Sequence, residues 1–445
     1  MKRDVLALAA ALLLATATPI QAADLSPAHW PQAERGELQA RESAFWPKAA
    51  RESRGAALVT GTASPVAVHA GVEALRQGGS AADAAIVVAL TQIARTMGGT
   101  VSYAGKLEVA YFDARSGAVS FLDAGWSPYA DERDLASIPE LGDEPKAAVL
   151  GRQTLVPGFM RGVEALHARF GRLPWADLFE PAIWSAETGV DASGVIGFLR
   201  NNQARFARTP EGRRLLAIAD EGPANSGGVF RQPDLARTLR AVARQGADEM
   251  YRGAWARDYV EAVGAYGGRA TLRDLERYRP RWREPIRATF AGAAVYGMSS
   301  GTLACASLTA LSLLDAMQVA AMGPYWKDPA AFRAYARAIQ YATLRQVTPP
   351  GPTPFEKRAG LAGAGCADRL TPAYAATLAP ELLKTEPFPF GETAVGAPEA
   401  GSHTMAVVVV DRRGDVAVLV HSANGAPTGL VVHGMPIPEA ATVNK

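Results

Sequence analysis

A threonine stands at the start of the most strand-like segment of the sequence. Thr404 is followed by Met, Ala and an unbroken run of valines over residues 407–410. A continuous apolar, β-branched run of this kind predicts a strand that is covered on both faces. Residues 411–415 then read as a tight polar turn with Gly414 at a left-handed position, and residues 416–421 predict the returning strand.

The hairpin would place several reactive side chains at its open end. With its centre near Arg413, Thr404 lies roughly opposite His421 and Ser422, and Asn424 follows just beyond the pair. We therefore expect a hydroxyl, an imidazole and a side-chain amide to meet at one end of two buried strands.

A threonine at the start of a chain can supply both a nucleophile and its base. If the bond between His403 and Thr404 is cut, the new α-amine lies close to the hydroxyl of the same residue. The ordinary pKa of an α-amine is about 8, which suits a base near neutral pH. The alternative is that Thr404 merely begins a strand, where β-branched residues are favoured.

The N-terminus has the pattern of a secretory signal. Lys2 and Arg3 precede an apolar stretch over residues 5–17, and Ala22 offers a small residue for cleavage. The apolar stretch is too short to span a bilayer of about 30 Å as a helix. We predict a signal peptide over residues 1–22 and a periplasmic or secreted protein, with no membrane span once the signal is removed.

Composition excludes some functions and leaves others open. About half of the 445 residues are hydrophobic, and 46 basic residues nearly balance 44 acidic ones, so nucleic acid is not an expected partner. The six histidines are widely spaced, so neither a metal site nor a cofactor is expected. An oxidising compartment would permit a disulfide between Cys305 and Cys366, but their spacing does not decide whether it forms.

Helices and strands are expected to alternate along one domain. Residues 23–55 read as an exposed irregular lead-in, and residues 348–400, rich in Pro, Gly and Ala, as a surface linker. Strands are predicted at 56–59, 107–113, 118–123, 285–290 and 294–296, and helices at 65–75, 81–94 and 303–317, with a mainly helical region over 157–262. This order predicts an α+β protein with helices packed on β-sheet layers.

Several segments, taken in order, resemble the γ-glutamyltransferase family of N-terminal-nucleophile hydrolases. Thr404 with Val409, Val410, Asp411 and Gly414 is similar to the nucleophile strand of that family. The other matching segments are residues 61–85, 156–159, 171–174, 275–286 and 295–301. The resemblance implies a four-layer αββα sandwich, self-cleavage between His403 and Thr404, and acyl transfer from a γ-glutamyl or related small-molecule amide to water or an amine. It also implies that Asn424, with Ser422 beside it, binds substrate.

The sequence departs from the family at the position of a substrate-binding arginine. The family places an Arg before a Pro to pair with the α-carboxylate of the substrate, whereas residues 122–128 carry Trp126 and no Arg. Lys106 in the altered glycine-rich loop is a candidate replacement cation, and a solvated loop lysine is the alternative. Glutathione is therefore expected to be a poor substrate, and an acylase for a non-glutamyl amide is a second hypothesis.

The segment after Thr404 is shorter than the small subunit of the family, since it runs only from residue 405 to residue 445. We expect residues 56–403 to correspond to the large subunit and residues 404–445 to a truncated small subunit, together forming one domain. The sandwich is then expected to be incomplete, unless a partner chain or oligomer completes it. A third hypothesis follows, in which the chain is an inactive exported relative that acts as a binding or scaffold protein.

Overall fold

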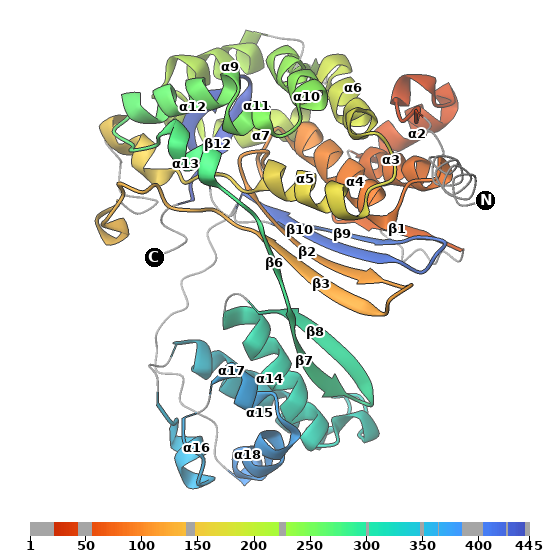
Figure 1. Ribbon diagram of the computed structural model, residues 1–445, viewed down its shortest axis with the longest axis vertical. Coiled ribbons are helices and arrows are strands. Elements are labelled where there is room, and N and C mark those ends of the chain that lie inside the picture. The colour runs from red at the N-terminus through yellow and green to blue at the C-terminus, as the bar shows by residue number, and fades with distance from the viewer. Residues whose placement is uncertain are drawn as a thin grey trace, which may run out of the picture. The chain divides into compact units, whose positions relative to one another are not determined.

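The computed structural model describes residues 22–42, 56–138, 147–221, 228–299, 302–347, 351–363, 365–384, 404–423 and 426–440. The chain divides into two compact units (Figure 1). Unit 1 contains Met1–Leu107, Ala124–Arg279 and Gly401–Lys445, and unit 2 contains Glu108–Asp123 and Pro280–Ala400. The sequence predicts that residues 56–403 and 404–445 form one domain together. Buried side chains that include Leu313, Tyr341 and Leu378 form a core cluster within unit 2.

The sheet that carries Thr404 contains three neighbouring antiparallel strands of unit 1. Strand β9 (Thr404–Val410) lies between β1 (Leu58–Gly61) and β10 (Val416–Ser422). The predicted hairpin register is confirmed, since Val410 pairs with Val416 and Thr404 with Ser422. Gly414 adopts a φ of 83° in the turn, a left-handed conformation that glycine reaches without steric cost.

Helices α3 (Pro65–Arg76) and α4 (Ala81–Thr96) support this sheet, and both lie close to their predicted positions. Every residue of α4 from Ala81 to Arg95 is buried, and the helix packs against β9, β10 and α3. The side chains of β9 and β10 alternate, so that one face of the hairpin is buried against α4 and the other is more open. The α4 layer therefore fixes which side chains of the hairpin face the core.

The remaining elements of unit 1 are mainly helical, as predicted for the middle of the chain. They surround two short antiparallel ladders, β4 (Val190–Asp191) with β5 (Val229–Phe230) and β11 (Pro427–Val432) with β12 (Met435–Pro438). The α-helices are α5 (Phe159–Phe170), α6 (Glu180–Thr188), α7 (Ala192–Asn201), α8 (Gln203–Phe206), α9 (Pro210–Glu221), α10 (Pro233–Gln245), α11 (Asp248–Tyr251), α12 (Ala254–Ala265) and α13 (Leu272–Arg277). Short 3-10 helices are η2 (Leu135–Ser137), η3 (Ala147–Gln153) and η4 (Trp175–Phe179).

The N-terminal lead-in is more ordered than the sequence indicated. Instead of irregular chain, it contains the 3-10 helix η1 (Pro27–His29) and the helix α2 (Gln32–Glu42). Polar composition alone hid this helix, because only Leu38 of α2 is buried. Its last residue, Glu42, pairs with Arg95 of α4 through both carboxylate oxygens, so tertiary ion pairing holds a weakly amphipathic segment in place.

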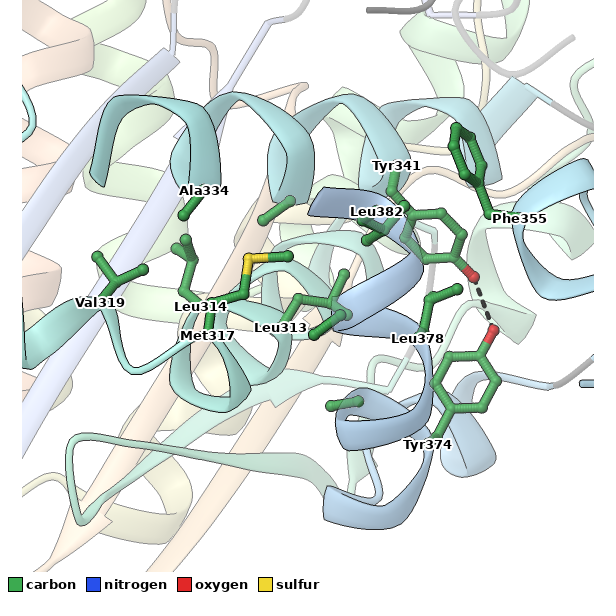
Figure 2. Close-up of a cluster of buried hydrophobic side chains, with 13 residues drawn as sticks. Leu313, Leu314, Met317, Val319, Ala334, Tyr341, Phe355, Tyr374, Leu378 and Leu382 are labelled. Atoms are coloured by element: carbon green, nitrogen blue, oxygen red, sulfur yellow. Dashed lines mark hydrogen bonds between the residues drawn. The ribbon is translucent and has the colours of Figure 1, made fainter. Parts of the chain in front are cut away.

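Unit 2 combines short antiparallel strands with a helical core. It contains most of β2 (Lys106–Asp113) and β3 (Ala118–Ala124), whose end residues Lys106, Leu107 and Ala124 belong to unit 1. It also contains β6 (Arg281–Arg283) and the hairpin of β7 (Pro285–Phe290) and β8 (Ala293–Met298). Its helices are α14 (Thr302–Ala316), η6 (Val319–Ala321), α15 (Pro329–Val347), α16 (Pro354–Arg358), α17 (Cys366–Arg369) and α18 (Pro372–Lys384). Figure 2 shows their shared core, in which the hydroxyls of Tyr341 and Tyr374 lie 2.7 Å apart.

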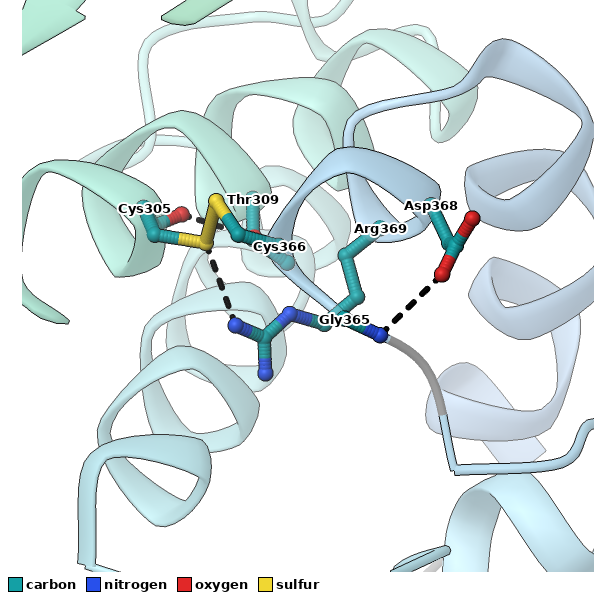
Figure 3. The surroundings of a disulfide bond; sticks show 6 residues. All are labelled: Cys305, Thr309, Gly365, Cys366, Asp368 and Arg369. Carbon is teal, nitrogen blue, oxygen red and sulfur yellow. Dashed lines mark hydrogen bonds between the residues drawn. A yellow bond between two sulfur atoms is a disulfide. The ribbon is translucent and has the colours of Figure 1, made fainter. Parts of the chain in front are cut away.

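The linker predicted over residues 348–400 is wrong for its described part. Pro354 and Pro372 begin helices rather than interrupt them, since proline is favoured in the first helical turn. Phe355 and Leu378 are buried in the core of unit 2. Cys305 and Cys366 form a disulfide that joins α14 to α17, and the Arg369 guanidinium donates to the Cys305 sulfur (Figure 3).

Both units mix helices with antiparallel strands, so the predicted α+β class is confirmed. The described strands β4 with β5, β7 with β8, and β11 with β12 form three sheets of two strands each. A second full sheet facing the β9–β10 hairpin is therefore not formed by the described residues of unit 1. The same residues contain no helix that is both long and apolar enough to cross a membrane.

Candidate active site

Thr404 is the first residue of β9, and its hydroxyl faces that of Ser422 on the neighbouring strand. The Thr404 Oγ1 donates a hydrogen bond to the Ser422 Oγ over 3.0 Å. The Thr404 side chain is exposed, whereas Ser422 is buried. The candidate nucleophile is thus reachable from solvent while its hydrogen-bond acceptor is held by the sheet.

Thr62, the residue after β1, hydrogen-bonds to β9 close to Thr404, on the side of β9 away from β10. The Thr62 N–H donates to the Ala406 carbonyl over 3.0 Å, and the Thr62 hydroxyl accepts the Ala406 N–H over 2.8 Å. Thr62 therefore extends the β1 ladder with its own side chain, two residues along from Thr404. The sequence analysis missed this residue, because its role depends on the pairing of segments far apart in the chain.

His421 lies on the other face of the hairpin from Thr404. It pairs with Met405, and adjacent residues of a strand point to opposite faces. Its Nε2 lies 2.9 Å from the Gln92 Oε1, and the Gln92 Nε2 donates to the Ala63 carbonyl. This network puts the proton of the imidazole on Nε2. The expectation that the imidazole joins the hydroxyl at one site is therefore wrong.

Burial also removes His421 as a general base. Desolvation lowers the pKa of His421 to about 3, so the ring stays neutral at physiological pH. Its Nδ1 is buried without a hydrogen-bond partner among the described residues. The general base for Thr404 must therefore be another group. The α-amine that Thr404 would gain on cleavage lies close to the hydroxyl, because both belong to the same residue.

A glycine-rich loop closes on the open end of the hairpin. A Cβ at Gly105 would come within 2.4 Å of the Ser422 carbonyl oxygen, so only glycine permits this approach. The Ala423 N–H donates to the Thr100 carbonyl over 3.1 Å, which joins the loop to the chain just after β10. The sequence indicated a glycine-rich loop around Lys106, but not the contact of this loop with Ser422.

Lys106 and Trp126 lie together in unit 1. The Lys106 ammonium lies 5.9 Å from the centre of the Trp126 ring, within the range of a cation–π contact. The Trp126 Nε1–H donates to the Ala104 carbonyl, and the ring packs against a small cluster that includes Ile138 and Leu155. Trp126 therefore has a packing role at the position where the sequence lacks the expected arginine.

The far end of the hairpin is fixed by charge. The guanidinium of Arg172 lies 3.4 Å from Asp411 and 3.1 Å from Asp415. The backbone N–H of Arg172 donates to Asp83, and the Ala81 N–H donates to Asp411. These contacts tie the turn of the nucleophile hairpin to the first turn of α4, which restricts sliding of the strand that begins at Thr404.

Two of the predicted site residues, His403 and Asn424, lie outside the described residues. Within the described part of the chain, no group of three His, Cys, Asp or Glu side chains could hold a metal ion. The arrangement that can act chemically is therefore the pair of hydroxyls, Thr404 and Ser422, at the open end of a hairpin bordered by Thr62 and Gly105.

A profile of the family described as gamma-glutamyltranspeptidase matches residues 67–434 of the chain. The chain belongs to the γ-glutamyltranspeptidase family. The matched range includes α4, most of α3 and the whole β9–β10 hairpin with Thr404 and Ser422. The resemblance seen in the sequence is thus confirmed.

Curated proteins that resemble the chain carry different names. The glutathione hydrolase proenzyme of Pseudomonas aeruginosa is 33% identical over 247 residues, which cover 53% of this chain and 42% of that protein. The acylase ACY 1 proenzyme of Pseudomonas sp. strain V22 is 32% identical over 308 residues, covering 66% of this chain and 54% of that protein. The chain spans about half the length of these curated relatives.

Solved structures of family members share the fold. The cephalosporin acylase of Bacillus halodurans superposes with a TM-score of 0.64 at 22% identity, over 89% of this chain and 72% of that chain. The γ-glutamyltranspeptidase of Helicobacter pylori gives a TM-score of 0.59 at 20% identity, over 75% of this chain and 96% of that chain. The likeness shows that the chain shares the fold of these two proteins.

Proposed function

We propose that this chain is an exported amidohydrolase or acyltransferase that uses Thr404 as an N-terminal nucleophile. The observation that carries the proposal is the Thr404 hydroxyl, exposed at the start of β9 and hydrogen-bonded to Ser422 over 3.0 Å. A threonine that only begins a strand does not need a hydrogen bond between its hydroxyl and a second hydroxyl. The family match over residues 67–434 also supports a catalytic role for this pair.

Processing would come first. The Thr404 Oγ attacks the carbonyl carbon of residue 403, the peptide nitrogen departs with a proton, and an ester between the two residues forms. Water hydrolyses that ester, which leaves a new carboxylate on residue 403 and a free α-amine on Thr404. Each step forms an oxyanion that hydrogen-bond donors must stabilise.

Turnover would repeat this chemistry on a bound amide. The Thr404 α-amine takes the proton of the hydroxyl as the oxygen attacks the substrate carbonyl, and then gives it to the departing amine. Water or an acceptor amine releases the acyl group from the ester. Ser422 holds the Thr404 hydroxyl in position, and Asn424 is proposed to orient the substrate.

Two substrate classes follow from the family. One is a γ-glutamyl amide, in line with the relative named glutathione hydrolase. The other is an amide whose acyl group carries no α-carboxylate, in line with the relative named acylase ACY 1. Trp126 favours the second class, because an aromatic ring replaces the arginine that would bind a carboxylate and Lys106 lies against that ring.

The deciding experiment begins with mass spectrometry of the purified chain and of Thr404→Ala. Two fragments that meet at residues 403 and 404 in the parent, and an intact Thr404→Ala chain, would support the proposal. The processed protein is then assayed on glutathione and on an uncharged acyl amide, and we expect faster hydrolysis of the uncharged amide. A chain that stays intact on long incubation, alone and in oligomeric fractions, would favour an inactive relative that acts in binding or as a scaffold.

Export is proposed on the N-terminal pattern alone. Cleavage after Ala22 would release the chain into the periplasm or the medium, where the disulfide between Cys305 and Cys366 can persist. Recovery of the protein from its native host with Met1 intact would contradict this proposal.

A further inference from the structure

The first described residues bind unit 1 through their backbone. The Ala23 N–H donates to the Asp177 Oδ2 over 2.7 Å, and the Leu25 N–H donates to the Glu180 Oε2 over 2.8 Å. The Asp24 N–H donates to the Gln77 Oε1 over 2.7 Å. Three successive backbone N–H groups therefore donate to side chains from two distant parts of the sequence, Gln77 and the pair Asp177 and Glu180.

Burial begins abruptly at Ala23. Ala22 is exposed, whereas Ala23 is 7% exposed and Leu25 is fully buried. The change from an exposed to a buried residue thus falls at the peptide bond between Ala22 and Ala23. This is also the bond that the signal-peptide pattern predicts to be cut.

The docking site carries an excess of negative charge. Glu180 has a raised pKa, caused first by burial and then by the nearby carboxylates of Asp177 and Asp24. His29 lies 2.7 Å from Asp24, but both side chains are exposed. Within the described part of the chain, Asp177 and Glu180 have no ion-pair partner and receive only neutral backbone N–H groups. A cation at the nitrogen of Ala23 would offset this repulsion.

We propose that cleavage of the Ala22–Ala23 bond creates an α-ammonium on Ala23 that Asp177 binds, so that removal of the signal peptide completes an ion pair. Water adds across the bond, Ala22 leaves with the signal peptide as a carboxylate, and the amine of Ala23 takes up a proton. The bond to the carboxylate is already charge-assisted through its acceptor. On cleavage the donor also becomes charged, so that the attraction between two opposite charges is added at the same position. The inference rests on the proposed export, but not on Thr404 chemistry.

The geometry selects one cleavage position. Cleavage one residue earlier or later would move the ammonium by about 3.8 Å along the chain, out of reach of the Asp177 carboxylate. The anchored segment continues through Trp30, whose ring meets His69 of α3 in a T-shaped contact with the ring centres 4.5 Å apart. It ends at Glu42, which pairs with Arg95 of α4. The ion pair therefore fastens a segment that braces the two helices beneath the nucleophile hairpin.

The test compares free and blocked N-termini on the full mature chain. Chains that begin at Ala23 are prepared with a free amine or with an acetylated amine, each with Asp177 and with Asp177→Asn. We expect Asp177→Asn to raise the unfolding equilibrium constant about fivefold more in the free-amine chain than in the acetylated chain. Glu37→Gln is the matched control, because its exposed carboxylate lies near Arg41 on α2, and it should show the same effect in both chains.

Two results would overturn the proposal. One is an equal effect of Asp177→Asn in the free and acetylated chains, which would make Asp177 an ordinary acceptor for an amide. The other is an exported protein whose first residue, by N-terminal sequencing, is not Ala23. All measurements can be made on Thr404→Ala protein, so failure of this inference and failure of the proposed enzyme function remain distinguishable.

Discussion

Thr404 and His421 occupy opposite faces of one β-hairpin, although they are only one register position apart. Ser422, not His421, is the direct partner of Thr404 across the two strands. The imidazole faces Gln92 of α4 and stays neutral, whereas the hydroxyl faces the open side. A serine–histidine type of base relay is therefore unavailable to Thr404 from this residue, and an α-amine base is the simplest alternative.

His421 should make the fold sensitive to acid. Burial lowers its pKa to about 3, from 6.5 in the unfolded chain, so its contribution to stability is fully present above pH 6.5 and is lost as the pH falls toward 3. We expect the free energy of unfolding to fall by about 2 to 3 kcal/mol more between pH 7 and pH 4.5 in the parent than in His421→Gln. Urea unfolding at both pH values measures this, and His29→Gln, at an exposed site, is the control. A parallel pH dependence in parent and His421→Gln would contradict the assignment.

Ser422→Ala should slow the chemistry of Thr404 more than it weakens the fold. The substitution removes the acceptor of the Thr404 hydroxyl while leaving the strand pairing intact. We expect the rate of self-cleavage, and of amide hydrolysis in processed protein, to drop about 10- to 100-fold. The rates follow from mass spectrometry and product release.

The matched control for Ser422→Ala is Val420→Ala, which alters the same face of the same strand without touching a hydroxyl. It should leave self-cleavage within a small factor of the parent rate. Unchanged self-cleavage in Ser422→Ala would show that the hydroxyl pair has no chemical role.

Gly105→Ala should disturb the same site from the loop side. The added methyl would lie 2.4 Å from the Ser422 carbonyl and 2.8 Å from the Ser102 carbonyl, and neither backbone oxygen can yield without moving the loop or the strand. We expect a loss of about 1 to 3 kcal/mol in the free energy of unfolding, together with slower self-cleavage. Gly194 lies in α7, and no atom outside its own helix backbone and chain neighbours lies within 4 Å of the new methyl. Gly194→Ala should therefore neither lower the free energy of unfolding nor slow self-cleavage.

The local sequence pattern was enough to predict the β9–β10 hairpin. It did not predict the features that depend on contacts between segments far apart in the chain. The valine run and the Gly414 turn fixed the pairing of Thr404 with Ser422, because a tight turn leaves one register. The same register, combined with strand alternation, already implied that His421 faces the other way. The contact of Gly105 with Ser422 was beyond prediction, since it joins segments more than three hundred residues apart. Residues 354–384 were misread because proline and alanine occur both in linkers and at helix starts.

The disulfide between Cys305 and Cys366 should stabilise unit 2 in particular. It closes a loop with a sequence separation of 61 residues, for which chain entropy predicts roughly 4 kcal/mol. The Cys305→Ser, Cys366→Ser double variant should therefore unfold unit 2 at lower temperature and expose α16 to α18 to limited proteolysis. The parent should behave in the same way in strong reductant, and the double variant should not respond to reductant at all. Protease cuts within residues 351–384, mapped by mass spectrometry, report on unit 2 directly, and a cutting pattern identical with and without the disulfide would contradict the prediction.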